Sequence, residues 1–301
     1  LAQAFFRHLA LCHTVVPEPT ETGEIILSAS SPDEQALVAG AQFFGYEFTE
    51  RTQASVKIRT GNSARDQAEG RAKARDESYE VLEILEFNST RKRMSVILKD
   101  RPSGDVLLLC KGADNVISER VTKTPANQRM LDQTAAHCSR YAEEGLRTLY
   151  IAQKRVSAAV FDSWQKRYVE ALGDASEVAK RSALEDNRID DLMDEMEHGL
   201  ELLGATAIED KLQDGVPSAI SKLAEAGISI WVLTGDKEAT AINIGFACEL
   251  LHNDMDLIIA NDELCKTEAE VLQMLEDKAA EVEEQDEEVA GDALHETGLR
   301  K

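Results

Sequence analysis

The sequence predicts an α+β domain followed by part of a doubly wound α/β domain. Three strand patterns follow one another closely, at Tyr79–Phe87, Arg93–Asp100 and Asp105–Gly112. The turn residues Pro102 to Asp105 join the last two, and short strands joined by tight turns form antiparallel sheets. From Leu200 the order changes to strand, helix, strand, helix, which is typical of a parallel sheet with helices on both faces.

Three parts are expected from these patterns. Residues 1–198 form the α+β domain, residues 199–260 the partial α/β domain, and residues 261–301 a mobile, acidic insertion or tail. The segment 276–292 contains nine acidic residues and one lysine. A polar stretch at 62–78, with four acidic and four basic residues, predicts a surface insertion.

Helix and strand patterns fill both domains. Ser31 and Pro32 are typical of a helix start, and Gly45 of its end. In the first domain the helix patterns are Phe5–Val16, Ser30–Gly45, Asn127–Glu144, Ser157–Ala171 and the charged stretch Ala175–His198. The remaining strand patterns there are Glu24–Ser28, Val56–Ile58 and Arg147–Lys154. The second domain contains strand patterns at Leu200–Asp210 and Ile228–Leu233, and helix patterns at Val216–Glu225 and Glu238–Leu250.

Composition excludes several classes of protein. A net charge of -23 argues against nucleic acid as a partner, because phosphate backbones are bound by basic surfaces. No apolar run approaches the roughly 18 residues of a membrane span. The five cysteines lie far apart and no HExxH pair occurs, so reduced thiols and no His or Cys metal site are expected.

One candidate phosphate site follows the apolar run Ile228–Leu233. Thr234, Gly235 and Asp236 come where open α/β sheets place their ligands, outside the carboxyl end of a strand. The hydroxyl can donate to a phosphoryl oxygen, and glycine lets backbone N–H groups approach it. A capped turn without a ligand is the alternative, and no GxxxxGK[ST] or GxGxxG loop occurs in the chain.

Aromatic and basic residues suggest a nucleotide site in the first domain. Phe87 ends a strand and precedes the basic run Arg91 to Arg93, which suits a purine stacked on a ring with its phosphates held by cations. A core phenylalanine beside solvated basic residues is the alternative. Lys111 and Arg147 stand at strand ends, where a cation has either a structural carboxylate partner or an anionic ligand.

Seven motifs occur in one order over about residues 9–251. They are CHTVVPE, SPDEQALV, EFNSTRKRMSVI, CKGAD, EEGLRTL, IEDKLQDGVP and TGDKEATAINIG. In these motifs the chain resembles the type IV, lipid-flipping branch of the P-type ATPases. The resemblance implies a nucleotide-binding domain inserted into a haloacid-dehalogenase-like phosphorylation domain, which would make residues 1–198 the former and residues 199–260 part of the latter.

The resemblance also assigns roles to single residues. Glu34 would accept a hydrogen bond from the adenine amino group, and Phe87 would stack on the ring. Ser89, Lys92 and Lys111 would line the path of the adenosine and phosphates, which Arg147 and Thr148 would steady. Thr234, Gly235 and Asp236 would meet the γ-phosphate, and Asp210 would be the hinge acid between the domains.

The nucleophile of that family is an aspartate in a DKTGT motif, which this sequence lacks. Its three Asp-Lys pairs continue differently, to Leu212, Glu238 and Ala279. The magnesium-holding GDGxND motif is also absent, so the ligands of Mg²⁺ are expected mostly outside this chain and no catalytic or metal-binding residue is assigned within it.

The expected function is therefore that of a soluble part of an ATP-driven phospholipid transporter. The chain would bind ATP at the cytosolic face of a membrane without hydrolysing it, and the parent would form an aspartyl phosphate with ATP and Mg²⁺. Lipid and membrane would be met through transmembrane helices outside the chain, and an accessory subunit is a candidate partner. The alternative is a nucleotide-sensing pseudo-ATPase or regulatory domain that transports nothing.

Overall fold

A computed structural model describes residues 1–19, 25–29, 31–61, 63, 74–209, 212–234, 238–253, 255–261 and 264–281. The chain divides into two compact units, Leu1–Leu250 and Leu251–Lys301. In the second unit residues 268–281 are helical. The acidic segment predicted at 276–292 therefore begins in this helix, and its residues from 282 onward lie outside the described part of the chain.

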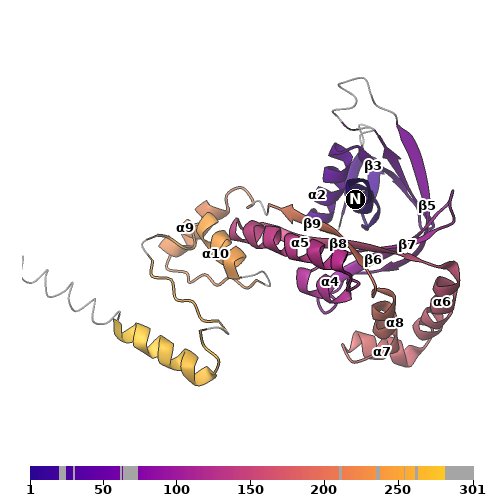
Figure 1. The fold of residues 1–301 in the computed structure, drawn as a ribbon. Coiled ribbons are helices and arrows are strands. Elements are labelled where there is room, and N and C mark those ends of the chain that lie inside the picture. The colour runs from indigo at the N-terminus through magenta and orange to yellow at the C-terminus, as the bar shows by residue number, and fades with distance from the viewer. Residues whose placement is uncertain are drawn as a thin grey trace, which may run out of the picture. The chain divides into compact units, whose positions relative to one another are not determined.

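A seven-stranded antiparallel sheet forms the centre of the first unit (Figure 1). Its strand order follows the chain: β3 (Tyr46–Arg51), β4 (Ser55–Thr60), β5 (Arg75–Leu85), β6 (Arg93–Asp100), β7 (Val106–Gly112), β8 (Arg147–Val156) and β9 (Glu201–Ile208). A separate antiparallel pair contains β1 (Val16–Pro19) and β2 (Ile25–Ser28). The predicted antiparallel sheet is confirmed.

Helices cover both faces of this sheet (Figure 1). On one face lie α1 (Ala2–Leu11) and α2 (Pro32–Phe43). The other face carries α4 (Asp114–Arg120), α5 (Pro125–Glu143), α6 (Ala158–Leu172) and α8 (Arg188–Met196), while α7 (Ala175–Ser182) packs on α6 and α8. The charged stretch predicted as one helix at 175–198 is thus two helices, separated by a turn in which Leu184 has φ 59°.

The central strands send alternate side chains into the two cores. On β6, Ile97 joins the core under α6 and α8, whereas Val96 and Leu98 join the core under α1 and α2. A sheet buried on both faces needs apolar residues at successive positions. This requirement explains the nearly continuous apolar runs of β6 and β7.

Strand β9 continues the sheet past the boundary expected near Gly199. It pairs antiparallel with β8, from Arg147 opposite Ile208 to Gln153 opposite Glu201. Contacts divide the chain only after Leu250. The first sheet therefore includes Glu201–Ile208, and a separate phosphorylation domain within 199–260 stays a prediction.

The strand predicted at Ile228–Leu233 does not form in the structure. Residues 228–234 pair with no other strand of the described chain, and Trp231 and Leu233 are 86% and 95% exposed. A strand needs a neighbour for its backbone donors and acceptors. The helices predicted on either side do form, as α9 (Val216–Glu225) and α10 (Glu238–Ala247).

The polar stretch predicted as an insertion at 62–78 lies mostly outside the described residues. Its last part is an exception, because Arg75 to Ser78 pair with β4 as the first residues of β5. None of the helices within the described ranges is long and apolar enough to cross a membrane.

Candidate functional site

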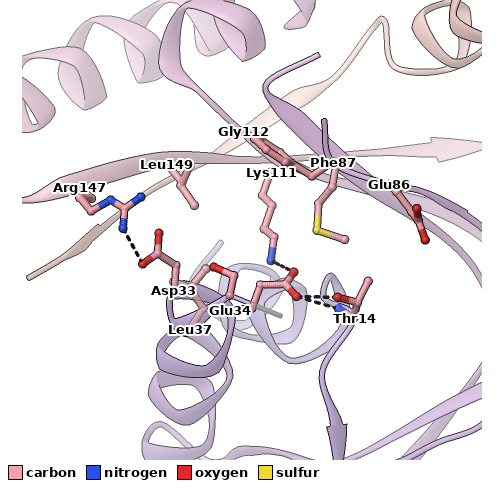
Figure 2. Close-up of a pocket in the computed structure, with 12 residues that line it drawn as sticks. Thr14, Asp33, Glu34, Leu37, Glu86, Phe87, Lys111, Gly112, Arg147 and Leu149 are labelled. Carbon is pink, nitrogen blue, oxygen red and sulfur yellow. Dashed lines mark hydrogen bonds and ion pairs between the residues drawn. The ribbon is translucent and has the colours of Figure 1, made fainter. Parts of the chain in front are cut away.

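A cavity of about 560 Å³ opens at the ends of the central strands of the sheet, beside the first turn of α2 (Figure 2). Antiparallel pairing brings the start of β6, the end of β7 and the start of β8 together there, and Lys111 of β7 lies between Met94 and Ile151. The cavity is lined by Thr14, Ser31, Asp33, Glu34, Leu37, Glu86, Phe87, Met94, Lys111, Gly112, Arg147 and Leu149.

A buried ion pair lies in the wall of the cavity. The ammonium of Lys111 donates to Oε1 of Glu34 at 2.7 Å, and the two side chains are 7% and 10% exposed. Oε2 of Glu34 accepts from the hydroxyl of Thr14 at 2.8 Å and from its backbone N–H at 3.2 Å. Burial raises the pKa of Glu34, but the charge of Lys111 and these hydrogen bonds outweigh it and lower the pKa below its ordinary value. Glu34 is therefore a carboxylate at neutral pH.

A second ion pair connects α2 to β8 across the cavity. Nη1 of Arg147 donates to Oδ1 of Asp33 at 3.2 Å, and the side chains are 40% and 24% exposed. Figure 2 shows both pairs on adjacent residues of α2, each reaching a cation on the sheet. The lining of the cavity thus contains two cations, each paired with a carboxylate of α2, and a third carboxylate, Glu86.

Phe87 supplies an exposed aromatic ring to the cavity. It follows β5 and its side chain is 63% exposed, although it lines the cavity. Gly112, which also lines the cavity, allows two backbones to approach closely. A Cβ atom at Gly112 would lie 2.6 Å from Cβ of Arg93 and 2.7 Å from the carbonyl oxygen of Lys92. An apolar, flat ring open to solvent is suited to stacking on a planar ligand.

The structure brings four of the predicted site residues to this cavity: Glu34, Phe87, Lys111 and Arg147. Thr148 lines an adjoining cavity of about 210 Å³, which shares Asp33, Arg147 and Leu149 with the first. Ser89, Lys92 and Thr234 are exposed and line neither cavity. Gly235, Asp236 and the expected hinge residue Asp210 lie outside the described residues.

Several lining residues were not predicted as part of a site. Two of them bind a predicted site residue: Thr14 donates to Glu34, and Asp33 accepts from Arg147. Asp33 stands next to Glu34 in the first turn of α2, and that adjacency was the available signal. Thr14 stands in the CHTVVPE motif, but its contact with Glu34 has no local signal because it depends on how α1 and α2 pack.

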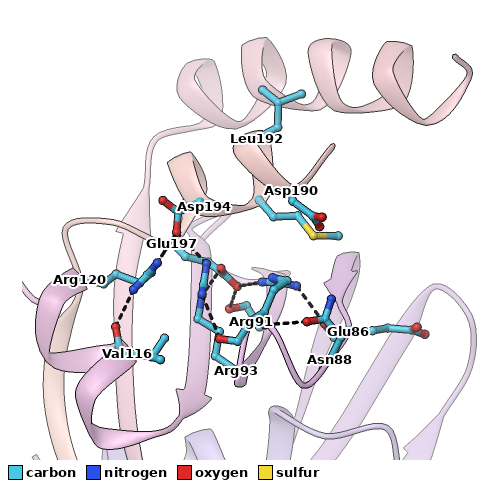
Figure 3. A network of polar contacts seen from close by, with 12 residues as sticks. Glu86, Asn88, Arg91, Arg93, Val116, Arg120, Asp190, Leu192, Asp194 and Glu197 are labelled. Carbon is cyan, nitrogen blue, oxygen red and sulfur yellow. Dashed lines mark hydrogen bonds and ion pairs between the residues drawn. The ribbon is translucent and has the colours of Figure 1, made fainter. Parts of the chain in front are cut away.

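Two arginines predicted beside Phe87 are not in the cavity. Arg91 and Arg93 are 6% and 4% exposed, and both bind the fully buried carboxylate of Glu197 at the end of α8 (Figure 3). Buried cations need a paired anion, and the sequence pattern did not indicate which one. The interpretation of these two residues as phosphate-binding cations is wrong.

Residues 2–215 match the family model of the P-type ATPase cytoplasmic domain N. The match covers more than half of the chain, so the chain belongs to the P-type ATPases.

Similar proteins within that family are named as phospholipid-transporting ATPases. The chain is 50% identical to "Probable phospholipid-transporting ATPase 11" and 49% identical to "Phospholipid-transporting ATPase 10", both of Arabidopsis thaliana, over 86% of its length in each case. It is 46% identical to "Phospholipid-transporting ATPase DRS2" of Saccharomyces cerevisiae, again over 86% of its length. These alignments cover 20%, 20% and 18% of the relatives, so the chain spans about a fifth of their length.

Proposed function

We propose that this chain is the ATP-binding part of a P-type ATPase that flips phospholipids across a membrane. The observation that carries the proposal is the cavity in which an exposed Phe87 lies near the buried pair of Lys111 and Glu34. A flat ring, a cation and an acceptor-only carboxylate are the three groups that a purine nucleotide needs.

In this proposal the adenine ring stacks on Phe87. The two oxygens of Glu34 already accept from Lys111 and Thr14, but each carboxylate oxygen can accept more than one hydrogen bond. The free acceptor capacity suits the exocyclic amino group of adenine. A carbonyl at that position, as in guanine, would face a carboxylate without a proton between them.

The phosphates would then run toward β8. Lys111 and Arg147 supply positive charge in the cavity, and Thr148 lines the adjoining one. Ser89 and Lys92 would contact the nucleotide from the turn after β5. Thr234, Gly235 and Asp236 would grip the γ-phosphate, and Asp210 would act at the hinge of a dehalogenase-like phosphorylation domain.

The parent protein would use ATP and Mg²⁺ to form an aspartyl phosphate and so move a phospholipid. The names of the relatives support this substrate class. In the part of the chain that the structure describes, no group of three or more His, Cys, Asp or Glu side chains could hold a metal ion. Because the sequence lacks the GDGxND motif, the proposal assigns the ligands of Mg²⁺ mostly to other segments. It also places this chain at the cytosolic face and keeps an accessory subunit as a candidate partner.

Titration calorimetry with ATP tests the binding site. Replacing Phe87 with alanine should weaken ATP binding by about 1–3 kcal/mol, the scale of a base–aromatic stack. Phe43 is a matched control, because it is similarly exposed at 67% and lies outside the cavity lining. Equal affinities for the wild type, Phe87→Ala and Phe43→Ala would refute the stacking site.

Incubation with labelled ATP and Mg²⁺ tests whether the phosphorylated aspartate lies outside this chain. Phosphoryl transfer to a carboxylate needs an activated aspartate and a metal ion that neutralises the developing charge. The purified chain should therefore form no hydroxylamine-sensitive phosphoenzyme. A covalent label that Asp210→Asn or Asp236→Asn abolishes would contradict the proposal and locate a nucleophile within the chain.

A further inference from the structure

A buried carboxylate outside the cavity connects α8 to the turn that carries Phe87. Glu197 follows the last residue of α8 and is fully buried. Its Oε1 accepts from Nη2 of Arg91 at 2.5 Å and from the hydroxyl of Ser95 at 2.6 Å, and its Oε2 accepts from Nε of Arg93 at 2.6 Å. Figure 3 shows the side chains of Glu197, Arg91 and Arg93 converging between the helix and the sheet.

Arg91 braces the turn from Glu86 to Lys92 at two points. Its Nη1 donates to the carbonyl oxygen of Glu86 at 2.9 Å, and its backbone N–H donates to Oδ1 of Asn88 at 2.6 Å. Phe87 lies in the sequence between these two anchored residues, which Figure 3 labels. The N–H of Lys92 closes the turn on the carbonyl of Asn88 at 2.9 Å.

The ring of Phe87 depends on this bracing, because little else holds it. A side chain that is 63% exposed has few packing contacts to fix its position. Its backbone must therefore set where the ring lies. Lys92 has φ 50°, a left-handed conformation that a non-glycine residue adopts only when its surroundings impose it.

We propose that Glu197 and Arg91 are positioning residues for the proposed nucleotide site. Glu197 holds the guanidinium of Arg91, and Arg91 holds the turn so that Phe87 faces the cavity. The inference rests on the proposed function only for the identity of the ligand. Neither residue lines the cavity, so both act through the turn.

Arg120 of α4, which contacts the same end of α8, offers a matched control for this inference. Arg120 of α4 makes two hydrogen bonds to Oδ1 of Asp194, at 3.0 and 2.6 Å. Asp194 lies one helical turn before His198, in the same end of α8 as Glu197, and also accepts from Arg93. Arg120→Ala therefore loosens this end of the helix without removing a contact to the turn.

Hydrogen exchange measures the bracing without any ligand. In Arg91→Ala and in Glu197→Gln, peptides that contain the amide of Lys92 should exchange about tenfold faster or more, because the turn opens locally. Asn88→Ala should do the same from the other side of the turn, and Arg120→Ala should not. Unchanged exchange in Arg91→Ala, Glu197→Gln and Asn88→Ala would overturn the inference. Equal acceleration in Arg120→Ala would also overturn it.

A double-mutant cycle measures the effect on ATP. Arg91→Ala should weaken ATP binding by about three- to tenfold in the wild-type background, and by nothing further in Phe87→Ala, because two residues that act through one contact are not additive. Additive losses would show that Arg91 acts elsewhere and would overturn the inference. If the wild type binds no ATP, the proposed function fails, and hydrogen exchange alone then decides whether Glu197 and Arg91 hold the turn.

Discussion

Lys111 and Glu34 lie 77 positions apart in the sequence, and their charged atoms lie 2.7 Å apart in a site that excludes most solvent from both. One charge compensates the other, and Thr14 donates two further hydrogen bonds to the carboxylate. The pair therefore belongs to the core of the domain as well as to the wall of the cavity.

Removing only one member of this pair should be costly. Lys111→Met leaves the buried carboxylate of Glu34 without a counter-charge, so the free energy of unfolding should fall by about 3 kcal/mol. The double variant Lys111→Met with Glu34→Gln should recover part of the loss, because no uncompensated charge remains. Urea unfolding of the three proteins checks this prediction, and a double variant less stable than Lys111→Met would contradict it.

Asp33 should oppose the binding of an anionic ligand, because its carboxylate pairs with Arg147 in the cavity. Asp33→Asn should tighten ATP binding by about threefold, within the range of about 1 kcal/mol for a partly exposed ion pair, and should leave adenosine binding nearly unchanged. Asp76→Asn changes the net charge equally, in the exposed pair with Arg59, and serves as the control. Equal effects of the two variants would show that only net charge matters.

Acid should destabilise the domain through two buried histidines. Burial, with a contribution from nearby cations, lowers the pKa of His8 and of His13 to about 3 from the ordinary 6.5. The unfolded chain binds these protons first, so stability is present above pH 6.5 and is lost as the pH falls toward 3. At pH 5 each histidine should cost about 2 kcal/mol.

Substitution separates this effect from the titration of carboxylates. His8→Gln should reduce the loss of stability between pH 7 and pH 5 by about 2 kcal/mol, because the replacement binds no proton in either state. His137→Gln, which replaces an exposed histidine of α5, should leave the loss as in the wild type. Denaturant titrations at the two pH values decide, and equal losses in all three proteins would refute the assignment to His8.

Gly112 should not tolerate a methyl group. In Gly112→Ala the new Cβ would collide with Arg93 and with the backbone of Lys92, so the free energy of unfolding should fall by about 1–3 kcal/mol. Gly40 lies within α2, and a Cβ atom added there would meet no neighbouring atom within 4 Å, so Gly40→Ala should stabilise the domain by up to about 1 kcal/mol. The same sign for both changes in thermal unfolding would contradict this prediction.

The sheet could be predicted from the sequence because its strands carry local signals. The predicted bounds of β6 agree with the observed ones, and those of β5, β7 and β8 agree within a few residues, since apolar runs and turn residues are short-range features. The strand expected at Ile228–Leu233 had the same signals but lacks a neighbour in the described chain. Strand formation depends on pairing as well as on pattern.

The candidate site could be predicted only in part. The motifs indicated Glu34, Phe87, Lys111 and Arg147, and the structure places all four at one cavity. For Lys111 the sequence left open a carboxylate partner or an anionic ligand, and the structure supplies the partner. Which charges pair depends on tertiary packing, so the burial of Arg91 against Glu197, 106 positions away, carried no local signal.

The order of the strands has a consequence for how the domain forms during synthesis. Each strand of the sheet pairs with the next one along the chain, so pairing can proceed in the direction of translation. The first helix is the exception. Phe5 of α1 packs against Gly204 of β9, and Leu203 of β9 belongs to the same core as Leu9 and Leu11.

At about 5–20 residues per second, the ribosome needs about 10 to 40 s to pass from α1 to β9. During that interval the apolar side of α1 has only part of its final covering, and chaperones that bind exposed apolar segments have time to engage it. The last strand of the sheet therefore sets the moment at which the beginning of the chain completes its burial.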